Sequence, residues 1–245
     1  MPELEQPDIY EQMQLPEESR LDEKIPKNLF YQQPKFSKSD EKLFTKDIEK
    51  IILRYSLTPD NTHLATFKDE IRDYEDLLII EIDLRQASKR ERIAELFWQY
   101  LPRPQMIVFK FDNSYEIAMA LVRTNQADNT RNTVEESLTF SWLEETDEFW
   151  RRMDYTAIPA RDFYQLYHGW FDRLSQEKAR RELSRTDVDG TKARQILARV
   201  SELTQQIELL RAQLKKETQF NRQVELNMQI KKLEQDVLRE RRQGK

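Results

Sequence analysis

The most constraining feature of the sequence is a heptad-spaced series of aliphatic residues in its last quarter. Its members follow one another at intervals of four, three, four, three and four residues: Ile196, Val200, Leu203, Ile207, Leu210 and Leu214. This spacing places all the side chains on one narrow stripe of an α-helix, as in a coiled coil. Burying one large aliphatic side chain contributes about 1.5–3 kcal/mol, so the stripe predicts a packed partner, in the same chain or in another. We call these residues the seam.

A second series with the same rhythm follows the seam and comprises Leu226, Ile230, Leu233 and Val237. The step of twelve residues between the two series does not keep the heptad phase. The chain therefore either turns back near residues 217–221 into a helical hairpin or continues as one helix that changes face. Because this stretch holds no Gly or Pro, we favour one continuous helix over residues 191–242. Phe220 and Asn221, at the phase break, join the seam as expected partner-binding positions.

Charge is distributed unevenly along the chain, whose formal net charge is −5. Residues 191–245 hold 13 Lys and Arg and 7 Asp and Glu, which gives a net charge of +6. Residues 1–190 hold the remaining 27 Lys and Arg and 38 Asp and Glu, which gives −11. Such a basic segment is typical of a solvated helix, and it also permits salt-dependent binding to DNA phosphates. The expected nucleic-acid-binding residues in that case are Lys215, Lys216, Arg222, Lys231 and Lys232.

Several site classes are disfavoured by residues that the sequence lacks. The chain has no Cys, two His and three Gly, where average usage of about 7% would give roughly seventeen Gly. Glycine-rich phosphate loops, thiolate zinc sites and cysteine nucleophiles therefore have no candidates. We predict no catalytic residue, no metal ligand and no cofactor. With no long apolar run and an acidic start, we expect no membrane span, no secretory signal and a cytoplasmic location.

The remaining periodicity predicts a flexible acidic leader over residues 1–24 and an α+β domain over residues 25–185, followed by the coiled-coil-like helical segment. Within the domain we expect helices over 40–55, 88–100 and from 159 onward, strands over 77–84, 106–111, 115–122 and 137–143, and a polar loop over 125–133. The order of these elements favours a mainly antiparallel sheet flanked by helices. Residues 187–190 (DVDG) begin like a calcium loop but lack its terminal acid, so we expect a turn with Thr191 as the N-cap of the next helix.

One acidic pair offers an alternative chemistry. Glu81 and Asp83 are two residues apart on the predicted central strand, so their side chains share a face and could hold Mg²⁺ in a nuclease of the restriction-endonuclease type. Such folds typically place a lysine two residues after the acid, where this chain has Asp83, although Lys110 on another strand could replace it in space. A solvated or partner-facing strand is the simpler interpretation.

Several stretches together resemble an uncharacterised bacterial and archaeal family that is known only as a domain of unknown function. They are residues 25–28 (IPKN), 30–31 (FY), 48–51 (IEKI), 80–82 (IEI), 107–109 (IVF) and, most specifically, 215–227 (KKETQFNRQVELN). The resemblance spans about residues 25–240 and leaves the leader outside. Members of that family are commonly encoded beside methyltransferase and helicase genes of type III restriction-like or phage-defence operons. The resemblance therefore implies a defence-associated accessory protein, without an activity or catalytic residues to carry over.

These observations favour a non-catalytic accessory or adaptor subunit that assembles through its C-terminal helix. The expected partner is a second copy of the chain, or a helicase or methyltransferase. The alternatives are nucleic-acid binding through the basic tail and, less favoured, a cryptic metal-dependent nuclease.

Overall fold

The computed structural model describes residues 8–33, 35–125, 132–186 and 188–242. The chain divides into two compact units, Met1–Phe171 and Asp172–Lys245. The first unit combines a β-sheet with helices and the second is helical, which confirms the α+β class. Helix α7 (Phe163–Leu183) contributes its first residues to one unit and its last residues to the other.

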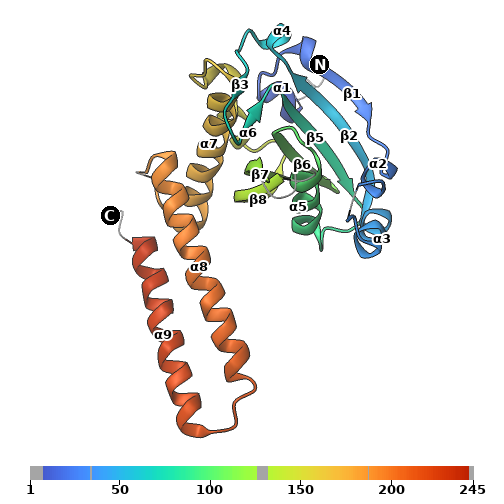
Figure 1. Cartoon of the computed structure of the whole chain (residues 1–245). Helices are drawn as coiled ribbons and strands as arrows, with labels where there is room; N and C mark the ends of the chain where they lie inside the picture. Colours follow the sequence, from blue (N-terminus) through green and yellow to red (C-terminus); the bar gives the residue numbers. More distant parts are fainter. Residues whose placement is uncertain (1–7, 34, 126–131, 187, 243–245) are drawn as a thin grey trace, which may run out of the picture. The chain divides into compact units, whose positions relative to one another are not determined.

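A six-stranded sheet of the described residues forms the centre of the first unit, in the order β1-β2-β5-β6-β7-β8 (Figure 1). Its strands are β1 (Arg20–Lys24), β2 (Ile48–Leu57), β5 (Leu77–Leu84), β6 (Gln105–Phe111), β7 (Ser114–Thr124) and β8 (Asn132–Glu144). Neighbouring strands are antiparallel except β5 and β6, which are parallel and joined by helix α5 (Arg90–Tyr100). The predicted, mainly antiparallel sheet is confirmed. A separate two-stranded ribbon consists of β3 (Phe67–Lys68) and β4 (Asp73–Tyr74).

One face of the sheet is covered by an aromatic and aliphatic core. Ile80 and Ile82 of β5 pack there together with residues of α2 (Asn28–Tyr31), α3 (Lys38–Asp47) and α5. The ring centroid of Phe30 in α2 lies 5.1 Å from that of Phe44 in α3 and 4.6 Å from that of Phe97 in α5. Three helices are thereby held on one face by a single cluster of rings.

The opposite face is covered by shorter segments. They include α1 (Ile9–Gln12), α6 (Phe149–Arg152) and the start of α7, whose residues Tyr10, Trp150 and Tyr167 contact the strands. The other short elements of this unit are α4 (Pro59–Thr62) and the 3-10 turns η1 (Glu17–Ser19) and η2 (Tyr155–Ala157). Trp150 of α6 meets Tyr115 of β7 edge-on with centroids 5.8 Å apart. The hydroxyl of Tyr167 in α7 accepts the backbone N–H of Ala120 and lies 2.9 Å from the carbonyl oxygen of Gln105. Helix α7 also buries a stripe of large side chains at helical spacing, namely Phe163, Tyr167, Trp170, Phe171 and Leu174.

The predicted flexible leader is wrong for residues 8–24. Ile9, Tyr10 and Met13 are buried, and β1 forms the first strand of the sheet. The backbone N–H of Tyr155 donates to the carbonyl oxygen of Met13, which ties this segment to the region around α6. The few apolar side chains of this acidic stretch are therefore core residues, and residues 1–7 lie outside the described part of the chain.

The predicted helix over residues 40–55 is half wrong, because α3 ends at Asp47 and β2 follows directly. The pairing of β2 with β5 shifts between Ile48 and Lys50 and again between Leu53 and Tyr55. Each such bulge adds a residue to the strand and moves the next buried side chain along the sequence. As a result the buried residues of β2 recur at nearly helical intervals, which explains the error.

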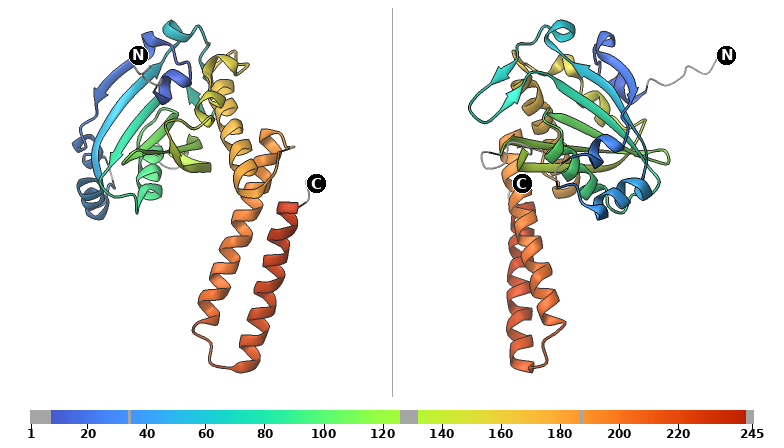
Figure 2. Two further views of the ribbon diagram at one scale, coloured as in Figure 1. Left: turned by 180° about the vertical axis from the view of Figure 1, so that it is seen from behind. Right: turned by 45° about the vertical axis from the view of Figure 1, so that its right-hand side comes forward.

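The second unit contains a helical hairpin, so the continuous helix that we favoured is wrong. Helices α8 (Gly190–Leu214) and α9 (Phe220–Arg242) lie side by side in every view (Figures 1 and 2). Their turn needs neither Gly nor Pro, because the Glu217 side chain accepts the backbone N–H groups of Thr218 and Gln219. The side-chain amide of Gln223 then donates to the Glu217 carbonyl oxygen at 2.7 Å. Side chains thus satisfy backbone groups that the helix ends leave open.

The start of α8 differs from the predicted capping. Asp189 is the N-cap and its carboxylate accepts the N–H of Lys192 at 2.7 Å, whereas Thr191 lies inside the first turn. Gly190 packs so closely on Asp172 that an added Cβ would come within 2.2 Å of the Asp172 Cβ. Residues 188–190 therefore lead into the helix, and residue 187 of the predicted turn lies outside the described part of the chain.

A distance between one residue of α8 and one of α9 tests the hairpin. Because the chain has no Cys, spin labels attach only to the cysteines that are introduced. We expect spin labels at Glu202→Cys and Arg239→Cys to lie well under half of the roughly 55 Å that one continuous helix would impose at 1.5 Å per residue. A control pair within α8, Glu202→Cys and Gln213→Cys, should give about 17 Å in either arrangement. Double electron–electron resonance measures both, and a separation near 55 Å for the first pair would contradict the hairpin.

Candidate functional site

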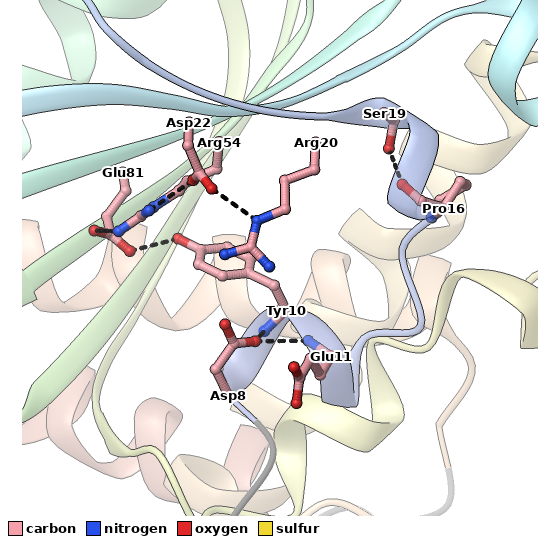
Figure 3. A network of polar contacts seen from close by, with 9 residues as sticks. All are labelled: Asp8, Tyr10, Glu11, Pro16, Ser19, Arg20, Asp22, Arg54 and Glu81. Atoms are coloured by element: carbon pink, nitrogen blue, oxygen red, sulfur yellow. Dashed lines mark hydrogen bonds and ion pairs between the residues drawn. The ribbon is translucent and has the colours of Figure 1, made fainter.

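A buried network of charged and polar side chains lies on the central strand (Figure 3). The Glu81 side chain is 3% exposed and pairs with Arg54, whose Nη2 lies 2.6 Å from Oε1. The hydroxyl of Tyr10 donates to the second carboxylate oxygen, Oε2, at 2.8 Å. Arg54 also pairs through Nη1 with Oδ1 of Asp22 at 2.7 Å, and Asp22 in turn pairs with Arg20. Both oxygens of the buried carboxylate are therefore satisfied by protein groups.

Three separate segments build this network. Glu81 faces away from the apolar core because the neighbouring Ile80 and Ile82 point into it. Arg54 lies at the second bulge of β2, and Tyr10 lies in the first turn of α1, where the carboxylate of the N-cap Asp8 accepts its N–H at 2.9 Å. The network thus joins the N-terminal segment to the two central strands.

The surroundings of Tyr10 and Asp22 in this network shift the pKa values of both groups. Burial raises the pKa of Tyr10 well above its ordinary value, and the charge of Glu81 raises it further, so the phenol keeps its proton as a donor. Burial also opposes ionisation of Asp22, but hydrogen bonds from Arg54 and Arg20 outweigh this effect and hold the pKa of Asp22 below its usual range. These contacts hold Tyr10, Arg54 and Asp22 in place around the buried Glu81 carboxylate and support the fold.

The predicted acidic pair is also salt-bridged. Glu81 and Asp83 lie on one face of β5, and Oδ2 of Asp83 pairs with Nζ of Lys50 at 3.0 Å. Lys110 does lie opposite Asp83 in the parallel register, and its Nζ is 5.4 Å from the ring centroid of Tyr115. Across the described residues, no three His, Asp or Glu side chains gather in a group that could hold a metal ion. These contacts do not favour the nuclease alternative, which stays a prediction.

The structure places the seam inside the hairpin. Ile196, Leu203 and Ile207 are buried, whereas Val200, Leu210 and Leu214 are half-buried. The second series packs on α8 from α9, where Leu226 and Ile230 are buried. An ion pair between Arg211 and Glu234, 2.7 Å long, joins the two helices on the surface. The hairpin therefore buries its own seam, and only Phe220 and Asn221 of the expected partner-binding residues are exposed.

The predicted nucleic-acid-binding residues are all exposed on the hairpin. Arg222 pairs with Glu225 at 2.7 Å. Within the described part of the chain, the other four, Lys215, Lys216, Lys231 and Lys232, make no ion pair. Their positive charges face water, but they are distributed around α9 and its turn, and no described groove gathers them.

A second exposed surface of α9 was not predicted from the sequence. The structure describes seven large hydrophobic residues as exposed, and five of them belong to the hairpin: Leu209, Phe220, Val224, Met228 and Leu238. Phe220, Val224 and Met228 follow at four-residue intervals, with exposed fractions of 75%, 42% and 68%. This spacing is the one available signal in the sequence, and the adjacent Leu226 and Ile230 obscure it because they fit the heptad rhythm better.

Comparison with known proteins assigns the chain to a family. Residues 13–237 match the Domain of unknown function (DUF4391). The chain belongs to this family. The match begins at residue 13, so part of the predicted leader falls inside it, in agreement with the buried Met13. No match is found among curated proteins or among solved structures. Among the described residues, no helix has the length and apolar content needed to cross a membrane.

The buried network predicts a strong dependence of stability on Arg54. We expect Arg54→Leu to lower the free energy of unfolding by about 3–5 kcal/mol, because it leaves the buried Glu81 carboxylate without its cation. The matched control Lys50→Leu removes a pair whose lysine is 44% exposed and should cost less than about 1 kcal/mol. Urea unfolding measures both, and equal effects would contradict a special role for the Glu81–Arg54 pair.

The depressed pKa of Asp22 predicts part of the acid sensitivity. Because the pKa in the folded state lies below the unfolded value of about 3.9, the contribution of Asp22 is fully present above that value and is lost as the pH falls through the folded pKa. Asp22→Asn should therefore flatten the acid limb of a plot of unfolding free energy against pH. Glu23→Gln, at an exposed neighbour in β1, is the control and should leave the limb unchanged.

Proposed function

We propose that this protein is a non-catalytic accessory subunit that acts by assembling with another chain through its C-terminal hairpin. The supporting observation is the concentration of exposed large hydrophobic side chains on the hairpin, and above all on α9. Scattered apolar residues are normal on protein surfaces, whereas a contiguous row on one helix is typical of an interaction site. The row Phe220, Val224 and Met228 spans two helical turns of α9.

The proposed assembly surface differs from the seam. The seam from Ile196 to Leu214 packs within the hairpin, so a partner could use it only by opening the two helices. The side of α9 that faces away from α8 needs no such rearrangement, and it includes the expected partner-binding residue Phe220.

The biological setting of the proposal comes from the family resemblance. We place the protein with bacterial restriction or phage-defence systems, in the cytoplasm, where a helicase or methyltransferase is the expected neighbour in a larger complex. The DUF4391 match is consistent with such a protein, since the family carries no assigned activity.

Nucleic-acid binding is the second candidate, and the four exposed lysines without an ion pair among the described residues favour it. Phosphate contacts by such lysines would make binding fall steeply as salt rises. Binding to phosphates does not require the apolar row on α9, so it leaves the exposure of that row unexplained. We therefore rank assembly with a protein chain first.

The proposal predicts that assembly in the native cell extract depends on one side of the hairpin. Wild-type protein should sediment with a mass above that of its single 29.7-kDa chain, and Met228→Glu should return it to the single-chain mass. The matched control Leu209→Glu changes an equally exposed leucine on α8 and should leave the assembly intact. Single-chain mass for the wild type would contradict the proposal, and loss of the assembly after nuclease treatment would favour nucleic acid instead.

A further inference from the structure

The side of α9 that faces away from α8 has a heptad rhythm of its own. From Val224 to Leu238 its residues follow at intervals of four, three, four and three, and the full row is Phe220, Val224, Met228, Lys231, Gln235 and Leu238. We call this row the outer face of α9. Val224 and Met228 precede the buried Leu226 and Ile230 by two residues each, so they point about 160° away from the hairpin interior. The α8 helix therefore does not cover this face.

A second copy of the chain is the occupant that this face fits, and the charged residues decide its direction. In a parallel pair, Lys231 would lie opposite Lys231 of the second copy, which places two ammonium groups together at the centre of the contact. In an antiparallel pair, Lys231 lies opposite Met228 of the second copy, and its aliphatic stem can pack on the thioether while the ammonium reaches water. The antiparallel arrangement is therefore favoured.

The antiparallel register also fixes which other residues of the face, and which charged residues beside it, lie opposite one another. It sets Val224 opposite Gln235 of the second copy and brings Leu238 to the Phe220 end of the other helix. Next to this row, Glu225 meets Lys232 of the second copy, and the two-fold symmetry makes this ion pair twice. Lys232 has no ion pair among the described residues, and Glu225 pairs there with Arg222 of the same helix, at 2.7 Å. Both side chains are exposed and can reach a partner.

We propose that a second copy of this chain covers the outer face of α9 as an antiparallel helix pair, fixed in register by the two symmetric Glu225–Lys232 ion pairs. This inference rests on the proposed assembly function and names its occupant. Met228 lies near the two-fold axis of the pair, and Phe220 lies at each end, where its ring is in reach of Arg241 of the second copy.

The test uses the purified full-length chain in sedimentation equilibrium and reverses the two flanking charges. The wild type should form a dimer. Glu225→Lys or Lys232→Glu alone should raise the dissociation constant roughly tenfold, because each creates two like-charge contacts. An equimolar mixture of the two single variants should restore wild-type affinity, since every Lys at 225 then meets a Glu at 232. The double variant, with both substitutions in one chain, should restore it as well.

Two control variants show whether the dimer uses the outer face of α9 or the opposite helix of the hairpin. Leu209→Glu should leave the dimer unchanged, and Met228→Glu should abolish it, with circular dichroism showing that both variants keep their helices. A monomeric wild type in pure form, or charge reversals that mixing does not rescue, would overturn the inference. If the purified chain is a monomer while the extract still holds an assembly that Met228→Glu removes, the proposed function stands with a different protein as occupant.

Discussion

The arrangement of the first unit depends on the carboxylate of Glu81, which lies buried in the middle of the central strand. Removing such a group from water costs several kcal/mol unless a cation and hydrogen-bond donors take the place of the solvent. Arg54 and Tyr10 supply them, and neither comes from the strand that carries the acid. A buried ion pair of this kind adds little net stability over an apolar contact, but it requires its partners to be in place. The partners of Glu81 come from the bulge of β2 at Arg54 and from the N-terminal segment, so the acid links both to the central strand.

The second unit depends on the burial of apolar side chains, because an isolated helix is only marginally stable in water. Helix α8 packs against α9, where Leu226 and Ile230 are buried, so the two heptad-spaced series belong to one hairpin of the same chain. This leaves the outer face of α9 as the surface available for assembly. The turn between the helices forms without Gly or Pro, and within it the Glu217 side chain accepts the backbone N–H groups of Thr218 and Gln219.

Periodicity predicted those elements in which one backbone geometry holds throughout. The strand β5, the helices α5 and α7, and the strands β6 and β7 lie where their patterns place them. It failed at β2, because two bulges convert the alternation of a strand into the spacing of a helix. It also failed for residues 8–24, because composition averages over a segment, whereas burial of Ile9, Tyr10 and Met13 depends on three side chains.

The sequence by itself determined the α+β class and the two heptad-spaced series, since these depend on the local order of apolar and polar side chains. Only the tertiary structure decided what each buried residue packs against. The pairing of α8 with α9 and the contacts of Glu81 with Tyr10 and Arg54 join residues that are far apart in the chain. The structure also separates close neighbours, because it exposes Val224 and Met228 and buries Leu226 and Ile230. A side-chain pattern states that a face must be covered. The partner that covers it is chosen by the three-dimensional packing of the rest of the chain.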